Sequence, residues 1–240
     1  MKDGSRNAII IVGPNAVGKT SVAYELARVL GNGEVINMDR LYLFRNFPIS
    51  SGLSDVLKET DVPRHLYEVL NADEQIFSID EYSSRVVILV EQILRRGNVP
   101  IIEGGSPKFF SGLYHKNLDQ DNKLFHPIVA LNYASTVDIT RKIEKRVASA
   151  FKEGLVDEIR NNVSQYGDTK IMREAKAIVP VVKYLNDKIT LEQAKEEIIQ
   201  GCVDLSEYQL SMFRSYKNIT WLDHDSTNVK STVMKILKMM

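Results

Sequence analysis

One eight-residue stretch constrains the fold of this chain more than any other feature. It follows an unbroken apolar run, Ala8–Val12, of the kind typical of a buried parallel strand. It precedes apolar residues at helical spacing, at Val22, Leu26, Val29 and Leu30. The stretch matches the pattern G-x-x-x-x-G-K-[ST] with Gly13, Pro14, Asn15, Ala16, Val17, Gly18, Lys19 and Thr20. Strand, pattern and helix together predict a loop whose backbone N–H groups bind phosphate.

The side chains of this loop complete the first predicted site. Lys19 adds a full positive charge, and the start of the following helix adds a partial one. The Thr20 hydroxyl can hold Mg²⁺, the one cofactor that we expect. We therefore predict that a diphosphate or polyphosphate binds to the eight loop residues and to Ser21, which follows them.

Strands and helices alternate through the first half of the chain. Apolar runs predict short strands, an amphipathic pattern ends at Gly97, and the stretch 40–75 is expected to be irregular because Pro48, Gly52 and Pro63 interrupt it. Such alternation predicts a parallel sheet with helices on both faces. The predicted strands cover 8–12, 34–38, 100–102 and 128–131, and the predicted helix covers 79–97.

The rest of the chain is predicted to be mostly helical. We expect an α/β fold, a P-loop NTPase-like parallel sheet flanked by helices, with a small, mostly helical C-terminal part. One domain is expected over 1–240, with a core of about 6–135 plus 215–240 and a helical part of about 136–214. The predicted helices cover 136–165, 170–186 with an interruption at Pro180, 190–214 and 226–240, and a last strand covers 219–222.

Composition excludes several classes of protein. The 240 residues carry 31 Lys and Arg against 31 Asp and Glu, and this neutral balance argues against broad, non-specific binding to nucleic acid. The single Cys202 excludes a disulfide framework and a thiolate zinc cluster, and suits a reducing compartment. No apolar run reaches the roughly 18 residues that span a bilayer. We expect a cytoplasmic monomer without a signal peptide or membrane contact.

The phosphate loop alone leaves the reaction open. A GTPase would need the strings N-K-x-D and D-x-x-G, and neither is present. A small-molecule kinase places a carboxylate after the second strand and two arginines in a lid, and Asp39, Arg141 and Arg146 could fill these roles. The residues by themselves therefore predict a P-loop transferase, with phosphoryl transfer as one open alternative.

Six further stretches narrow this choice, because they follow the order and spacing of a known family. Residues 39–51 resemble the segment after the second strand of the isopentenyltransferases that alkylate the N6 amine of adenine, and 99–106 resemble the P-I-x-x-G-G-[ST] of that family. The resemblance covers nearly the whole chain and is far more specific than the loop alone. The other stretches that resemble the family are 62–66, 76–82, 141–155 and 219–221.

The resemblance implies a role for each residue of a donor site. The loop, including Lys19, would hold the diphosphate of dimethylallyl diphosphate, with Mg²⁺ bound to Thr20. Arg146 resembles the arginine that reaches this diphosphate from across the cleft, and Asp39 resembles the general base. The family usually has threonine at the position of Asn15, whose amide can still donate a hydrogen bond there.

For the residues around the acceptor, the resemblance implies binding roles and no catalytic role. Arg40 would contact the phosphate of the nucleotide, and Ser51 and Ser106, next to Gly105, would form hydrogen bonds around the adenine. Tyr208 would lie on the helix that closes the prenyl site. Outside this set, Glu103 could order a water on Mg²⁺, and Arg141 is expected to be structural.

The family has two branches, which differ in the acceptor. Our prediction is a free adenine nucleotide, AMP or possibly ADP or ATP, which makes the chain an adenylate dimethylallyltransferase of cytokinin biosynthesis. Three features favour it: Ser106 where tRNA enzymes have threonine, only about forty residues between Gly105 and Arg146, and no Lys or Arg in 201–208. The neutral net charge of the chain also fits a nucleotide acceptor better than a phosphate-rich RNA. The alternatives are a tRNA dimethylallyltransferase acting on adenine next to the anticodon, for which tRNA is the less favoured partner, and a small-molecule kinase.

Overall fold

The computed structural model of the protein describes residues 7–54, 61–118, 124–133 and 136–240. Within these residues the strands form a six-stranded sheet, in the order β3-β2-β4-β1-β5-β6, in which every pair is parallel. The central strand β1 is apolar and fully buried, and its Ile10 pairs with Ile102 on one side and Ile128 on the other. This confirms the predicted parallel sheet. The strands are β1 (Ala8–Val12), β2 (Gly33–Asn37), β3 (Arg64–His65), β4 (Val99–Glu103), β5 (Phe125–Tyr133) and β6 (Thr220–His224).

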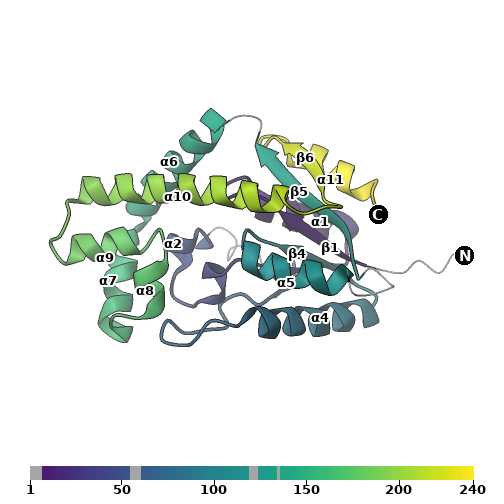
Figure 1. The fold of residues 1–240 in the computed structure, drawn as a ribbon, viewed down its shortest axis with the longest axis horizontal. Coiled ribbons are helices and arrows are strands. Elements are labelled where there is room, and N and C mark those ends of the chain that lie inside the picture. Colours follow the sequence, from purple (N-terminus) through teal and green to yellow (C-terminus); the bar gives the residue numbers. More distant parts are fainter. Residues whose placement is uncertain (1–6, 55–60, 119–123, 134–135) are drawn as a thin grey trace, which may run out of the picture.

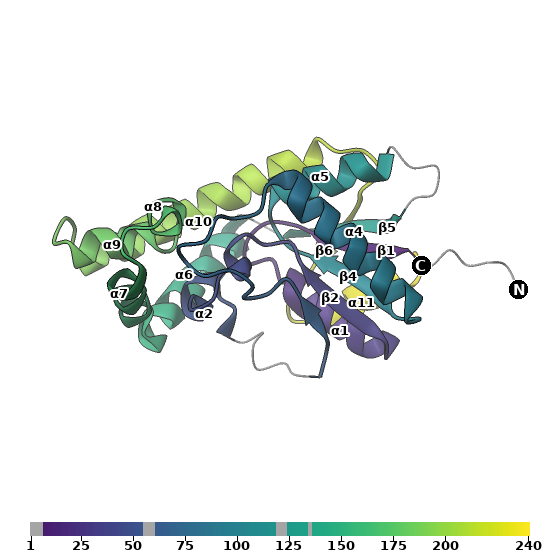
Figure 2. The ribbon, with the colours of Figure 1, turned by 90° about the horizontal axis from the view of Figure 1, so that it is seen from below.

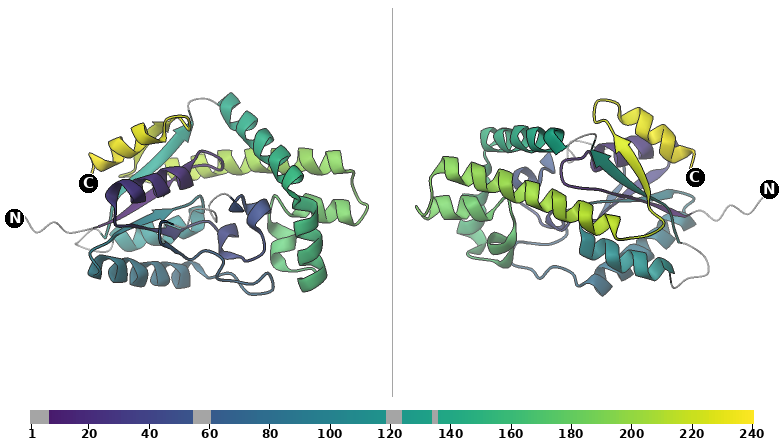
Figure 3. Two further views of the ribbon diagram at one scale, coloured as in Figure 1. Left: turned by 180° about the vertical axis from the view of Figure 1, so that it is seen from behind. Right: turned by 45° about the horizontal axis from the view of Figure 1, so that its top comes forward.

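Helices cover both faces of the sheet (Figures 1 and 3). On one face α1 packs against α11, and on the other α4 packs against α5. α4 begins at a capping box, in which the Ser78 hydroxyl accepts from the backbone of Glu81 and the Glu81 carboxylate accepts from the backbone of Ser78. These helices are α1 (Lys19–Leu30), α4 (Ile79–Arg95), α5 (Pro107–Leu118) and α11 (Val229–Leu237).

The remaining helices stand beyond one end of the sheet, as Figures 1 and 2 show. The longest of them, α10, runs back along the sheet, where Phe213 packs edge-on against Phe110 of α5 with ring centroids 5.4 Å apart. In the described ranges no helix is both long and apolar enough to cross a membrane. The helices of this part are α6 (Thr136–Glu153), α7 (Leu155–Tyr166), α8 (Lys170–Glu174), α9 (Val179–Leu185) and α10 (Leu191–Arg214).

Three local predictions differ from the structure. The helix predicted over 136–165 breaks at Gly154, whose left-handed backbone (φ 101°) starts α7 as a separate helix. The stretch 40–75, predicted to be irregular, contains the 3₁₀ turn η1 (Leu41–Leu43), the short helix α2 (Pro48–Ser51) and the edge strand β3. No helix was predicted at α5, although Phe109, Phe110, Leu113 and Tyr114 are buried at helical spacing.

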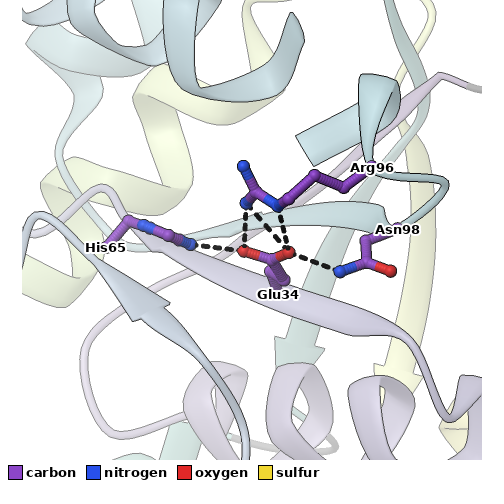
Figure 4. A network of polar contacts seen from close by, with 4 residues as sticks. All are labelled: Glu34, His65, Arg96 and Asn98. Atoms are coloured by element: carbon purple, nitrogen blue, oxygen red, sulfur yellow. Dashed lines mark hydrogen bonds and ion pairs between the residues drawn. The ribbon is translucent and has the colours of Figure 1, made fainter. Parts of the chain in front are cut away.

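At the opposite end of the sheet from these helices, a buried carboxylate joins three segments (Figure 4). Glu34 of β2 accepts hydrogen bonds from His65 of β3 (2.6 Å), from Arg96 after α4 (2.7 Å) and from Asn98 (2.6 Å). Burial disfavours the ionised form, but the hydrogen bonds from these three side chains outweigh it and lower the pKa of Glu34. The network holds the edge of the sheet and takes no part in the cavity described next.

Candidate active site

A cavity of about 1140 Å³ lies between the phosphate loop, the carboxyl ends of the strands and the helical part. Parallel α/β sheets bind ligands at the carboxyl ends of their strands. Most of the residues predicted from the sequence line it together, although Gly13, Pro14, Val17 and Arg141 do not. Those that line it are Asn15, Ala16, Gly18, Lys19, Thr20, Ser21, Asp39, Arg40, Ser51, Gly105, Ser106, Arg146 and Tyr208.

The phosphate loop is shaped by its backbone. At Gly13 φ is 149°, and a β-carbon there would come within 2.8 Å of the Leu131 carbonyl oxygen of β5, so only glycine fits. The Lys19 ammonium donates to the Pro14 carbonyl (3.0 Å) and thereby closes the loop on itself. Gly13, Pro14 and Val17 are buried beneath the loop. The other five loop residues line the cavity.

Two buried charges meet beside the loop. The Thr20 hydroxyl lies 3.2 Å from both oxygens of Glu103, and the Tyr67 hydroxyl donates to the same carboxylate at 2.9 Å. Burial raises the pKa of Glu103, although Lys19 and the bond from Tyr67 oppose the shift. Burial likewise lowers the pKa of Lys19, although Glu103 and Asp39 oppose that shift. An anionic ligand in the loop would stabilise the charged form of Lys19.

Asp39 lies two residues after the end of β2 and is held by its neighbours. The backbone N–H of Asp39 donates to the Asn37 side chain (2.6 Å), and the Asn37 amide donates back to the carbonyl of Asp39 (3.0 Å). The Asp39 Oδ1 accepts from the backbone N–H of Leu41 (3.0 Å). Among the described residues no group donates to its Oδ2. The carboxylate is thus fixed in direction and keeps one oxygen available in the cavity.

Three polar groups of Asn15, in the phosphate loop, are bound by distant elements. Its backbone N–H donates to Gln209 Oε1 of α10 (2.7 Å), and its carbonyl accepts from the Tyr133 hydroxyl of β5. Its side-chain oxygen accepts from Arg146 of α6 (3.0 Å). The other end of the Gln209 amide donates to the carbonyl of Gly105 (2.7 Å), so this buried side chain joins the two loops that flank the cavity.

Arg146 links the phosphate loop to α2. Besides Asn15, its guanidinium donates to the carbonyl of Ser51, at the end of α2. The other end of α2 is held from α7, where the carboxylate of Glu158 accepts from the backbone N–H groups of Ile49 (2.7 Å) and Ser50 (2.9 Å). Burial raises the pKa of Glu158, although these two hydrogen bonds oppose it. The helical part therefore positions α2 over the cavity.

The other predicted residues lie at the cavity and have partners within the protein. Arg40 is exposed and pairs with Glu174 at 3.8 Å. The hydroxyl of Ser51 is used within its own turn, where it accepts from Leu53 (3.1 Å), and that of Ser106 accepts from the backbone of Phe109 (3.4 Å) at the start of α5. Tyr208 lines the cavity with 49% of its surface exposed.

Sequence reasoning missed the residues that hold the site in shape. Gln209, Tyr133 and Glu158 were not singled out, since a polar residue on a helix or at a strand end carries no local sign of a partner more than a hundred positions away. Asn37, which binds Asp39 two positions further on, was not singled out either. On α6 the prediction named Arg146, which lines the cavity, and kept Arg141, which is exposed, as structural. It did not name Lys142, which also lines the cavity.

Comparison with known proteins places this geometry in context. A family model described as "IPP transferase" matches residues 42–127 and 108–216. The tRNA dimethylallyltransferases of Corynebacterium jeikeium and Caldanaerobacter subterraneus are 26% and 25% identical to the chain, over 91% and 89% of it and 92% and 90% of the relatives. The solved tRNA isopentenylpyrophosphate transferase of Staphylococcus epidermidis shares the fold, with a TM-score of 0.85, 21% identity and 98% of each chain covered.

These relatives overturn the predicted acceptor. They are named for tRNA, so the prediction of a free adenine nucleotide with a role in cytokinin synthesis is wrong, as is the ranking of tRNA as the less favoured partner. The signals used for that prediction have other physical causes. The Ser106 hydroxyl caps α5, which threonine would do equally well. The stretch 201–208 lacks cations, but lysines of α6 and of 170–176 line the cavity instead.

Proposed function

The chain belongs to the IPP transferase family, and on this premise we propose that it transfers the dimethylallyl group of dimethylallyl diphosphate to the amino group of an adenine in tRNA. The similarity to tRNA dimethylallyltransferases over most of both chains supports the substrates. One observation carries the proposal: the phosphate loop and Asp39 line the same cavity. Alkylation of an amine needs an anchored leaving group and a base in one site.

The donor side of this proposal rests on the phosphate loop. Lys19 and the N–H groups of the loop bind the diphosphate and neutralise the charge that it gains as the carbon–oxygen bond breaks. Arg146 enters from α6 beside Asn15 and is close enough to the loop to add a second positive charge. Contacts that strengthen as the diphosphate departs lower the barrier to transfer.

The oxygen groups beside Lys19 fit Mg²⁺. Thr20 and the buried Glu103 offer a hydroxyl and a carboxylate 3.2 Å apart, and Mg²⁺ prefers hard oxygen ligands of this kind together with water and substrate phosphates. We assign Thr20 to hold the ion and Glu103 to accept from its water. When bound, the ion would supply further positive charge to the departing diphosphate.

The acceptor side rests on Asp39. The exocyclic amine of adenine is a weak nucleophile because its lone pair is delocalised into the ring, so it needs orientation and a proton acceptor. The Oδ2 of Asp39 can provide both. In the reaction the amine nitrogen bonds to the prenyl carbon, the electron pair of the carbon–oxygen bond leaves with the diphosphate, and the amine proton passes to Asp39.

The test is alkylation of defined acceptors. The protein is incubated with Mg²⁺, dimethylallyl diphosphate and unmodified tRNA, with AMP and ATP in parallel reactions, and the nucleosides are analysed by mass. We expect a five-carbon gain on adenosine from tRNA and release of diphosphate. A gain confined to AMP or ATP would contradict the tRNA acceptor, and consumption of ATP with phosphorylation of another molecule would contradict prenyl transfer.

A further inference from the structure

Three lysines that line the cavity form no salt bridge in the described part of the chain. Lys142 and Lys145 lie three residues apart on α6 and therefore share one side of the helix. Lys176, between α8 and α9, lines the same cavity. In the described part of the chain none of the three forms an ion pair. We call these three residues the cationic wall.

The acids near these lysines are engaged by other groups. Hydrogen bonds from Thr227, with a smaller contribution from the charge of Lys142, lower the pKa of Asp225. Glu174 lies 3.8 Å from Arg40 and 3.9 Å from Lys170, so its charge is already shared. Asp73 and Glu74 line the cavity from the segment before α4. Although the whole chain is neutral, positive charge is concentrated on the helical side of the cavity, where it would attract an anion.

The lysines are anchored beside the site. The Lys142 ammonium lies 5.7 Å from the ring centre of Tyr133, whose hydroxyl binds the phosphate loop. The stem of Lys176 packs along α10, where a β-carbon added to Gly201 would lie 3.4 Å from it. Long side chains that pack their stems and leave the ammonium group in water are suited to bind phosphate at a surface. The donor diphosphate already has Lys19 and Arg146, so the wall is available for another anion.

We propose that the cationic wall binds phosphodiester groups of a single-stranded RNA segment that carries the target adenine; this inference rests on the proposed function. For its amine to reach Asp39, the adenine must be unstacked and inserted into the cavity, as is usual for bases recognised in RNA loops. The phosphates on either side of it then stay at the mouth of the cavity, within reach of the wall. Each lysine neutralises one phosphate and releases its counterion.

The small size of the chain strengthens this assignment. About 218 of its 240 residues are spread over 289 positions aligned with the Corynebacterium enzyme, so about 71 positions of that enzyme have no counterpart here. The chain offers less surface for the rest of a tRNA than that relative does. The wall should therefore supply a large share of the RNA affinity, and a short single strand should bind nearly as well as a whole tRNA.

The experiment compares two double variants with the same change in charge. Lys145→Gln/Lys176→Gln alters the wall, and Lys235→Gln/Lys238→Gln alters two exposed lysines of the α11 region, outside the cavity. The dissociation constant of a single-stranded RNA of about ten nucleotides with one central adenosine is measured between about 50 and 200 mM salt. The KM for dimethylallyl diphosphate and the melting temperature are measured in parallel.

We expect the wall variant to lower the slope of log affinity against log salt by about 1.4, since each phosphate contact to a single strand contributes about 0.7. RNA affinity should fall at least about tenfold at low salt, with the donor KM and the melting temperature unchanged. An unchanged slope would overturn the cationic wall, and so would a raised donor KM without loss of RNA affinity. If the wild-type protein bound this RNA through the wall but alkylated no tRNA, the proposed function would fail and the wall would stand.

Discussion

The phosphate loop and α2 line the same cavity but are held in place by different means. The loop owes its shape to neighbours in the chain: a buried strand before it, a helix after it and the bond from Lys19 to Pro14. α2 is four residues long and is held at one end by Glu158 and at the other by Arg146, both about a hundred positions away. Apart from the contacts of Asn15, the donor half of the site is therefore local in the sequence, and the other half is assembled by the fold.

Asn15 is the point at which the two regions meet. Its side chain accepts from Arg146, which also binds the end of α2, and its backbone is bound by Gln209 and Tyr133. If the two regions work independently, damage to one should leave the other intact. If Asn15 couples them, a change in α2 or α10 should be felt in the loop. The following substitutions distinguish these cases, in order of expected effect.

Replacing Asp39 should have the largest effect, because it should abolish most of the turnover and leave diphosphate binding intact. Asp39→Ala removes the proposed proton acceptor, so kcat should fall by about 10²- to 10⁴-fold, while the dissociation constant of pyrophosphate changes by no more than about twofold. Turnover and calorimetric binding of pyrophosphate provide the two measurements. Asp73→Ala, a second carboxylate lining the cavity, is the control and should keep full activity. Near-normal turnover of the Asp39 variant would show that another group accepts the proton.

Replacing Gln209 tests whether α10 maintains the loop. Gln209→Leu leaves the Asn15 N–H and the Gly105 carbonyl without their partners, a loss on the order of 1–3 kcal/mol. Pyrophosphate binding should weaken by about tenfold as the loop loses its shape. Gln200→Leu on the exposed side of the same helix is the matched control. Equal pyrophosphate affinities for the two variants would show that the loop needs no support from α10.

Two glycines allow the coupling through Arg146 to be isolated. A β-carbon on Gly52 (φ 75°) would lie 2.2 Å from Arg146, whereas one on Gly31 (φ 73°) would meet nothing within 4 Å. Both Gly→Ala changes should cost about 1–2 kcal/mol of stability, because both place alanine in the left-handed region. Only Gly52→Ala should also displace Arg146 and lower kcat/KM, by roughly three- to tenfold. A similar kcat/KM for both variants would argue against coupling through Arg146.

The smallest expected effect, on the order of 1 kcal/mol or less, concerns the carboxylates that hold α2 and the sheet edge. The raised pKa of Glu158 means that the folded state binds more protons, so its contribution to stability falls as pH rises above about 4.5. Glu34 has a lowered pKa, so its contribution is present above about pH 4.5 and is lost as pH falls. Urea unfolding at pH 4 and pH 7 measures both.

Relative to wild type, Glu158→Gln should therefore gain stability between pH 4 and pH 7, while Glu34→Gln should lose it. The two trends have opposite signs and serve as controls for each other. Parallel trends would contradict the inference that burial raises the pKa of Glu158 in the folded state.

Much of the architecture was predictable because it depends on neighbouring residues. Apolar runs identified β1, β2 and β4, and the helical pattern of α4 ends near its predicted boundary. The break at Gly154 was missed because the amphipathic pattern continues across it. The acceptor was misjudged because Ser106 and the lack of cations in 201–208 were interpreted as signs of a free nucleotide, whereas Ser106 caps a helix and the cations of the cavity come from other segments.

By itself the sequence determined the strand, glycine-rich loop and helix that can bind a diphosphate, and the carboxylate that follows the second strand, because each depends on backbone geometry within a few residues. Only the tertiary structure decided what holds this machinery together. Asn15 and Gln209 are 194 positions apart, and Ser51 and Arg146 are 95 apart. No local pattern records such contacts, since a hydrogen bond between distant residues forms only when packing of the intervening helices has brought both groups to the same place.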